Sequence, residues 1–417
     1  MTRHLAFFNG ESVDTSKQTV SKAPTLPSMS LAGKRALFVT TIPLTLTSFL
    51  IPFATYFQQL GMHVDCAAYE ADKAPGLEAF EKRYSIDWDR SLASFTRLPL
   101  ITRQLFAAFD AGNYDIVHVH TPIAAYLTRK ALHQWKKQHP GARTRLIYTA
   151  HGFHFHEGQE SPLKGKAFYQ MEKRALPWTD ALVCMNDEDE SAAHALCASA
   201  STTICTRIDG IGCDFEQYER IRRARHESTK TLDESPVRII IIAEHNDNKD
   251  HALLFEALTL LNSADVTNWR LSVVGQGLLT KELKEKVLAM GLEGQTTFHG
   301  QVDASKLITL MGKSDIGVLV SKREGLPRSL MELCACGVCI AGTNTRGIID
   351  EVRDPRAIAF ERTPQEVALM LEELIANKAL RDALALEQYT YAREHYDLPN
   401  ILAAYENLYT RVIKART

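Results

Sequence analysis

Two glutamates that could contact a polyhydroxyl ligand, Glu324 and Glu332, lie eight positions apart in the sequence. They follow the apolar run 316–320, which predicts a strand. Pro327 between them suits a first helical turn, where its missing N–H has no partner to lose. Roughly 8–12 Å would then separate the two carboxylates along the helix axis. This distance could span the sugar and the ribose of one nucleotide sugar, and the N–H groups of the first turn favour a diphosphate. The alternative is a pair of solvated acids at the start of a surface helix.

Histidines at strand ends form a second group that could act on a ligand. His120 ends the predicted strand 115–120, and His151 follows the predicted strand 146–149. The carboxyl ends of parallel strands meet at one edge of a sheet, so we expect both histidines to face the same cleft as Glu324, as catalytic groups. Two other interpretations stay open. One is zinc binding, although no acidic or cysteine ligand completes a known spacing, and the other is a structural role.

A third group of residues suits the binding of a phosphate-bearing nucleotide. Lys249 follows the predicted strand 237–243, where a cation would face a diphosphate. The run Gly-Gln-Gly at 275–277 predicts a tight turn near a nucleotide but not a dinucleotide site, because the third glycine of that fingerprint is missing. The predicted nucleotide-side residues include Lys249, Glu332, Gly325, Leu326, Gly275 and Arg328. Arg323 and Arg346 are further candidates, with solvated surface charge as the alternative.

The elements that must position these residues alternate along the chain. Short apolar runs, which predict strands, alternate with helical stretches in two successive series. The sequence therefore predicts an α/β protein with two Rossmann-like doubly wound domains that face a cleft, where ligands of such folds bind. The predicted parts are a disordered N-terminal extension at 1–33, a first domain at 34–212, a second domain at 213–395 and a C-terminal helix at 396–417 that packs back on the first domain.

Composition narrows the class of protein. Hydrophobic residues make up 45% of the 417 residues and charged residues 24%, with a net charge of −2. These values are ordinary for a globular protein and give no overall attraction to nucleic acid.

The 8 cysteines form no secreted-type framework, which indicates a reducing cytoplasm. Residues 36–58 carry no charge, but Pro43 and Pro52 interrupt them, so we expect a strand, a loop and a helix there instead of a membrane span.

These motifs together resemble those of family-4 glycosyltransferases, over the chain from about residue 34 onward. The segment 324–332 is similar to the family's E-x7-E motif, and the likeness continues through Ala-Cys-Gly at 335–337 to Arg-Gly-Ile-Ile-Asp-Glu at 346–351. The runs His-Val-His-Thr-Pro at 118–122 and Tyr-Thr-Ala-His-Gly-Phe-His-Phe at 148–155 resemble a subgroup from bacterial polysaccharide and capsule pathways.

The resemblance implies a role for several motif residues. In that family the first glutamate contacts hydroxyls of the donor sugar and the second holds the ribose, which assigns these roles to Glu324 and Glu332. The histidine of the Thr-Ala-His run approaches the donor sugar, which points to His151, with His120 as the second candidate. The family's lysine corresponds to Lys249, and the resemblance places the backbone at His299 near the base of the nucleotide.

The resemblance also implies a reaction. We expect a retaining enzyme of the GT-B fold that moves a sugar from a nucleoside-diphosphate sugar to a glycan or a polyprenyl-diphosphate-linked acceptor. UDP is the expected nucleotide, with a hexose or N-acetylhexosamine as the sugar. The nucleotide sugar is a substrate, so no cofactor is expected, and no metal either. Two alternatives stay open: a nucleotide-sugar 2-epimerase and a non-catalytic sugar-binding partner.

Basic residues in the first half could contact such an acceptor or a membrane. They lie on the predicted helix 122–138 and in the turn that follows it: Arg129, Lys130, Lys136, Lys137, Arg143 and Arg145. Cations clustered on one face attract anionic lipid head groups. We therefore expect a cytoplasmic protein, with peripheral contact at the inner face of the membrane. The alternative is an ordinary solvated helix face.

Overall fold

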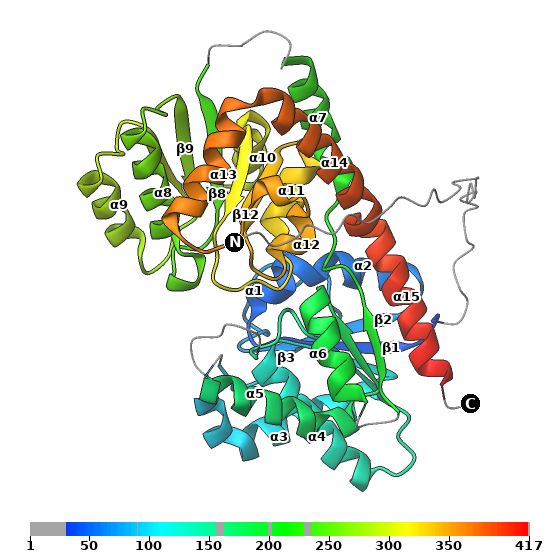
Figure 1. The fold of residues 1–417 in the computed structure, drawn as a ribbon. Coiled ribbons are helices and arrows are strands. Elements are labelled where there is room, and N and C mark those ends of the chain that lie inside the picture. Colours follow the sequence, from blue (N-terminus) through cyan, green and yellow to red (C-terminus); the bar gives the residue numbers. More distant parts are fainter. Residues whose placement is uncertain (1–30, 90, 156–161, 199–201, 229–234, 416–417) are drawn as a thin grey trace, which may run out of the picture.

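The computed structural model describes residues 31–89, 91–155, 162–198, 202–228 and 235–415. It shows two α/β domains, one above the other (Figure 1). The predicted N-terminal extension therefore lies almost wholly outside the described residues. Its last part belongs to the first domain, because Leu31 is fully buried in that core and the Gly33 N–H donates to the Gly61 carbonyl at 2.8 Å.

The first domain is built on a sheet of parallel strands in the order β3-β2-β1-β4-β5-β6-β7. Most of these strands are short apolar runs that are buried along their length, as expected for a sheet covered on both faces. Their bounds are β1 Arg35–Val39, β2 His63–Ala68, β3 Arg83–Ser85, β4 Ile116–His120, β5 Arg145–Thr149, β6 Ala181–Cys184 and β7 Ile204–Arg207.

The second domain repeats this plan with the order β10-β9-β8-β11-β12-β13, also parallel. Its strands are β8 Val237–Ile242, β9 Trp269–Val274, β10 Thr296–Gly300, β11 Ile316–Leu319, β12 Cys339–Thr343 and β13 Ile358–Ala359. The prediction of two doubly wound α/β domains is confirmed. Two edge strands, β3 and β13, were not predicted, because three and two residues are too few to show a pattern.

Helices cover both faces of each sheet (Figure 1). Those of the first domain are α1 Pro43–Thr45, α2 Ile51–Gln59, α3 Leu98–Gly112, α4 Pro122–Gln138, α5 Pro162–Ala175 and α6 Asp187–Cys197. Those that follow are α7 Phe215–Ser228, α8 His251–Ser263, α9 Thr280–Ala289, α10 Ala304–Lys313, α11 Arg328–Ala335, α12 Ile348–Val352, α13 Pro364–Ala376, α14 Lys378–Tyr396 and α15 Leu398–Lys414. None of the described helices combines the length and the apolar composition that a membrane crossing requires.

The chain crosses between the domains at two places that lie side by side. The Cys213 N–H donates to the Tyr396 carbonyl at 2.8 Å, and the Leu398 N–H donates to the Cys213 carbonyl at 2.9 Å. Helix α15 then runs along the first domain, as the red helix of Figure 1 shows. Its apolar face joins the core of that domain, where Tyr409 stacks on Phe57 with ring centroids 4.4 Å apart.

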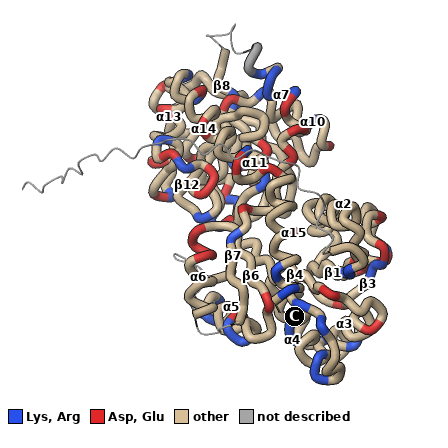
Figure 2. The backbone as a smooth tube through the Cα atoms, turned by 90° about the vertical axis from the view of Figure 1, so that its right-hand side faces the viewer, with Lys and Arg blue, Asp and Glu red and all other residues tan. Residues whose placement is uncertain are grey.

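Cations and anions are interleaved over both domains (Figure 2). The expected basic face on α4 is smaller than predicted. Arg129 is 1% exposed and binds the Glu172 carboxylate at 2.7 Å, with its guanidinium 4.4 Å from the ring centroid of Tyr148. Arg145 and Lys136 both contact the Asp180 carboxylate. The sequence prediction was therefore wrong for Arg129, because its partner lies on another helix.

The packing of α15 gives a testable prediction. Leu408 on α15 is 3% exposed in the first-domain core, so Leu408→Ala should lower the free energy of unfolding by about 2–5 kcal/mol. The matched control is Leu386→Ala on α14, where the side chain is 66% exposed and the expected change is within about 0.5 kcal/mol. Urea unfolding measures both, and equal effects would contradict the packing described for α15.

Candidate functional site

The first-domain part of the site is a group of buried histidines at the carboxyl ends of β4 and β5. His120 Nδ1 lies 2.9 Å from His151 Nε2, and one proton must lie between them. The ring of His118 packs 4.2 Å from that of His120, and its nitrogens bind Tyr409 and Thr149, each at 2.7 Å. His118 and His120 lie two positions apart on β4, so their side chains share one face of the sheet. The structure adds that His118 is a structural link to α15, whereas His120 Nε2 is buried without a hydrogen-bond partner among the described residues.

Burial keeps these imidazoles neutral. It lowers the pKa of His118 to about 3 and that of His151 to about 4, and it lowers the pKa of His120 well below its ordinary value. The residue after His120 holds a strained backbone, since Thr121 is β-branched and has φ 64°. The Thr41 hydroxyl, 2.7 Å from that of Thr121, stabilises this turn. Strain of this kind concentrates at functional sites.

The second-domain part of the site follows β8 and β11, which are neighbouring strands. Lys249 Nζ binds Glu324 Oε1 at 2.6 Å. The two loops are joined further by the Lys322 N–H, which donates to the Asn248 carbonyl at 2.8 Å, and by the Asn248 amide, which donates to the Arg323 carbonyl at 3.0 Å. A cation and a carboxylate that were predicted from separate motifs therefore lie in direct contact.

Glu332 lies on α11, beyond the loop that carries Glu324. Arg328 Nε donates to its Oε1 at 2.8 Å, and the same guanidinium donates to the Ser48 carbonyl of the first domain. Leu326 packs beside Gly210, near Met331. Arg328 is thus engaged by protein groups on both sides of the cleft, and its predicted contact with phosphate stays a prediction.

The remaining predicted residues lie further along the same edge of the second sheet. Gly275 follows β9 with φ +130°, and a Cβ there would lie 2.0 Å from the Ala243 carbonyl oxygen, so only glycine fits. His299, in β10, has its Nε2 3.2 Å from the Ser272 hydroxyl. In the sheet order, His299, Gly275, Lys249 and Glu324 follow one another across three strand spacings, roughly 14 Å. This array suits an elongated ligand.

The two halves of the site touch each other through glycines. A Cβ on Gly325 would lie 2.3 Å from the His151 carbonyl oxygen, and one on Gly152 would lie 3.2 Å from the Gly325 Cα. The Asn186 amide, from the first domain, donates to the Gly325 carbonyl at 2.7 Å. The structure therefore brings His120, His151, Gly325, Glu324 and Lys249 together where the domains meet.

An interdomain ion pair beside this contact could not be predicted from the sequence. Arg346 follows β12 in the second domain, and its guanidinium binds the carboxylate of Asp189 on α6 of the first domain. Both side chains are buried, at 4% and 1% exposure. Arg346 was predicted as a phosphate helper or a solvated charge, and the structure shows neither. The sequence shows Asp189 in the run Asn-Asp-Glu-Asp at 186–189 and Arg346 at the start of the motif 346–351, and neither run indicates contact with the other.

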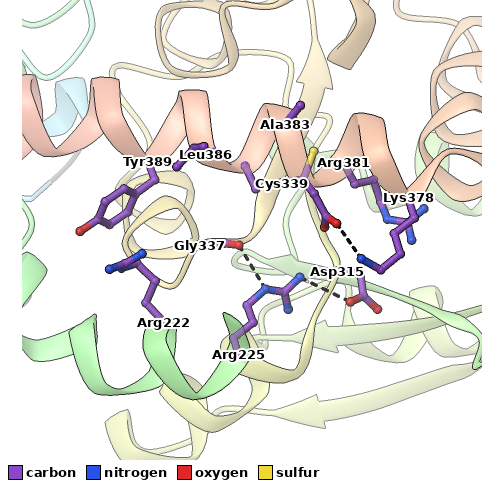
Figure 3. Close-up of a pocket in the computed structure, with 12 residues that line it drawn as sticks. Arg222, Arg225, Asp315, Gly337, Cys339, Lys378, Arg381, Ala383, Leu386 and Tyr389 are labelled. Carbon is purple, nitrogen blue, oxygen red and sulfur yellow. Dashed lines mark hydrogen bonds and ion pairs between the residues drawn. The ribbon is translucent and has the colours of Figure 1, made fainter. Parts of the chain in front are cut away.

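A cavity of about 410 Å³ in the second domain lies away from this site (Figure 3). It opens between α7 and α14, at the amino ends of β11 and β12, whereas ligands of doubly wound folds bind at carboxyl ends. Its cations already have protein partners: Arg225 binds Asp315 and the Gly337 carbonyl, and Lys378 binds Asp382. We therefore assign the ligand site to the interdomain contact.

Comparisons with known proteins agree with this architecture. Residues 48–201 match the model "Glycosyltransferase Family 4", and residues 223–393 match "Glycosyl transferases group 1". EpsD of Bacillus subtilis, which is named as a glycosyltransferase, is 29% identical over 91% of this chain and 98% of its own length. A Campylobacter jejuni protein named N,N'-diacetylbacillosaminyl-diphospho-undecaprenol alpha-1,3-N-acetylgalactosaminyltransferase is 30% identical over 65% of this chain and 71% of its own. Anabaena HepE, solved with UDP and glucose, superposes with a TM-score of 0.68 at 17% identity, over 90% of this chain and 99% of HepE.

The fold and the site thus define a two-domain glycosyltransferase of the GT-B architecture, which acts in polysaccharide or glycoconjugate synthesis. Within that class the chain belongs to glycosyltransferase family 4, in a bacterial polysaccharide subgroup. The roles of the individual site residues stay predictions.

The buried histidines predict how stability depends on pH. Their folded-state pKa values lie below the unfolded value of 6.5, so unfolding takes up protons and stability falls as the pH decreases below about 6.5. Each such histidine should account for about 1 kcal/mol between about pH 6.5 and about pH 5.5. His118→Asn should therefore reduce this pH dependence in urea unfolding. His63→Asn, at a histidine whose side chain is 48% exposed, is the control and should retain the wild-type dependence.

Proposed function

We propose that this protein transfers a sugar, with retention of configuration, from a UDP-sugar to a polyprenyl-diphosphate-linked glycan. The observation that carries the proposal is the contact between the backbone of His151 in the first domain and Gly325 in the second, next to the ion pair of Glu324 with Lys249. Neutral hydrogen-bonding groups on one side and charged groups on the other suit a reaction between a neutral acceptor hydroxyl and an anionic donor.

The second domain is the proposed donor side. Lys249 and the helix start at Arg328 would stabilise the negative charge that develops on the departing diphosphate. Glu332 would hold the ribose. Gly275 and His299, at the ends of neighbouring strands, would lie beside the base. UDP is the proposed nucleotide because HepE, of the same fold, was solved with UDP and glucose. Residue 244, which also follows β8, is a glutamate, so we propose that Lys249 has the larger share of the diphosphate contact.

The proposed acceptor follows from the relatives. The name of the Campylobacter jejuni protein specifies a diphospho-undecaprenol-linked acceptor and an N-acetylgalactosaminyl group. By analogy we propose an N-acetylhexosamine as the sugar, and a lipid-linked acceptor that brings the first domain to the inner face of the membrane. Lys137 and Arg143, both exposed at the end of α4, remain available there for anionic head groups.

The proposed chemistry is a front-face displacement. The bond from the sugar to the diphosphate oxygen breaks, the acceptor oxygen bonds to the same face of the sugar carbon, and the acceptor proton passes to the leaving phosphate. The protein's task is positioning and charge stabilisation. Lys249 is paired with Glu324 before the donor binds, so the diphosphate would take over the lysine and free Glu324 for the sugar hydroxyls. We propose that neither a metal nor a cofactor takes part.

Nucleotide binding tests the donor side. UDP should raise the melting temperature of the wild type, because a ligand that binds only the folded state adds about 2.7 kcal/mol at a hundredfold excess over its dissociation constant. Glu332→Ala should reduce that shift. Glu282→Gln is the control, since Glu282 is exposed on α9 and should leave the shift unchanged. GDP or ADP stabilising the protein in place of UDP would contradict the choice of nucleotide.

A transfer assay with a polyprenyl-diphosphate-linked glycan tests the reaction. Glu324→Gln should lower kcat by roughly 100-fold or more, through loss of transition-state contacts, while UDP still binds. Product analysis by NMR should show the anomeric configuration of the donor, with transfer unaffected by a chelator. An inverted product would contradict the retaining mechanism. Conversion of UDP-sugar without any acceptor would contradict transfer and indicate an epimerase.

A further inference from the structure

The interdomain ion pair of Arg346 lies between the two loops that are proposed to hold the reacting groups. We propose that Arg346 is a positioning residue, which assembles the active site by fastening the His151 loop of the first domain to the Glu324 loop of the second. It contacts no proposed substrate atom. The proposal rests on the proposed function in so far as these two loops carry the reaction.

Three groups of the Arg346 guanidinium reach three partners. Nη1 binds the Asp189 carboxylate and Nη2 donates to the Phe153 carbonyl, both in the first domain. Nε donates at 3.1 Å to the carbonyl of Glu324 in its own domain. Because the guanidinium is planar and rigid, fixing two of these contacts fixes the direction of the third. The residue two positions after His151 is thus tied to the backbone of Glu324 itself.

The first-domain partner of Arg346, Asp189 on α6, is itself hydrogen-bonded to the His151 loop. The Asp189 carboxylate accepts the Phe153 N–H at 3.2 Å and the Asn186 side-chain amide at 2.9 Å. Asn186 caps α6 and donates to the Gly325 carbonyl at 2.7 Å. The start of α6 and Arg346 therefore hold both loops from opposite sides. In this arrangement the catalytic geometry depends on the ion pair being made.

Arg346 and Asp189 lie in different domains, so the loss of their ion pair should have a different effect from the loss of a buried ion pair inside one domain. Removing one partner of a buried pair inside a domain destabilises the fold, because a charge is left without a partner. Here the pair joins two domains that the chain connects at the adjacent crossings near Cys213 and Tyr396, so a separation of the domains would let water solvate Asp189. Loss of Arg346 should therefore disrupt the closed arrangement while each domain stays folded.

The test compares Arg346→Met and Arg346→Lys with the wild type. The control is Arg356→Met, at an arginine whose side chain is 53% exposed and which pairs with Asp354 away from the cleft. We expect Arg346→Met to lower kcat roughly 100-fold, since misplaced groups lose this much rate. Its melting temperature and the dissociation constant for UDP should stay at the wild-type values. Lysine keeps the positive charge but lacks the planar set of N–H donors of a guanidinium, so Arg346→Lys should recover little of the lost kcat.

Hydrogen–deuterium exchange reports the loops directly and needs no donor. Arg346→Met should speed exchange in peptides that cover residues 151–155 and 322–327, which lie in different domains, and not in α13. Asp189→Asn should have the same effect, and the double variant should be no worse than either single one, because both remove one interaction.

Two results would overturn the proposal. One is full activity in Arg346→Lys, which would show that charge alone suffices. The other is loss of activity in Arg346→Met without the expected change in the two loops. Unchanged exchange in both loops would show that Arg346 does not position them, and a lowered melting temperature would show a stabilising role confined to one domain. A wild type that neither binds UDP nor transfers sugar would instead contradict the proposed function, and the exchange result would still stand by itself.

Discussion

A guanidinium removed from water needs partners, and Arg346 finds most of its partners in the other domain. Its contacts with Asp189 and Phe153 are available only when the two sheets present their carboxyl ends to each other. The approach of Gly152 to Gly325 has the same requirement, since no side chain fits between them. The site therefore exists as a unit only while the domains are closed, and closure is specified by a small number of directional contacts.

The two domains contribute different electrostatics to this unit. Burial keeps His118, His120 and His151 neutral, so the first domain offers hydrogen-bonding groups without net charge. The second domain supplies the ion pair of Lys249 and Glu324. This division fits a chemistry in which negative charge develops on the donor's diphosphate while the attacking acceptor hydroxyl is neutral. Helix α15 links the two domains at this site. It follows the second domain in the chain, and its Tyr409 binds His118, whose ring packs against that of His120.

Much of the fold was predictable because strand and helix patterns are local. The apolar runs at 237–243 and 316–320 showed the strands that precede Lys249 and Glu324, and carboxyl-end placement followed from parallel topology. The prediction missed β3 and β13, which pair only at sheet edges and are too short to show periodicity. It was wrong for Arg129, whose partner Glu172 lies on another helix and is matched to it only by packing.

The sequence by itself determined the class of protein, the two-domain plan and the identity of the residues at the strand ends, because each depends on patterns within a few tens of residues. Only the tertiary structure decided which of these residues meet. Arg346 was a candidate for nucleotide contact or a solvated charge, and it forms a buried pair with Asp189, 157 positions away. His118, two positions before His120, binds Tyr409 from the far end of the chain. Contacts between domains depend on how two complete folds pack, which no local pattern records.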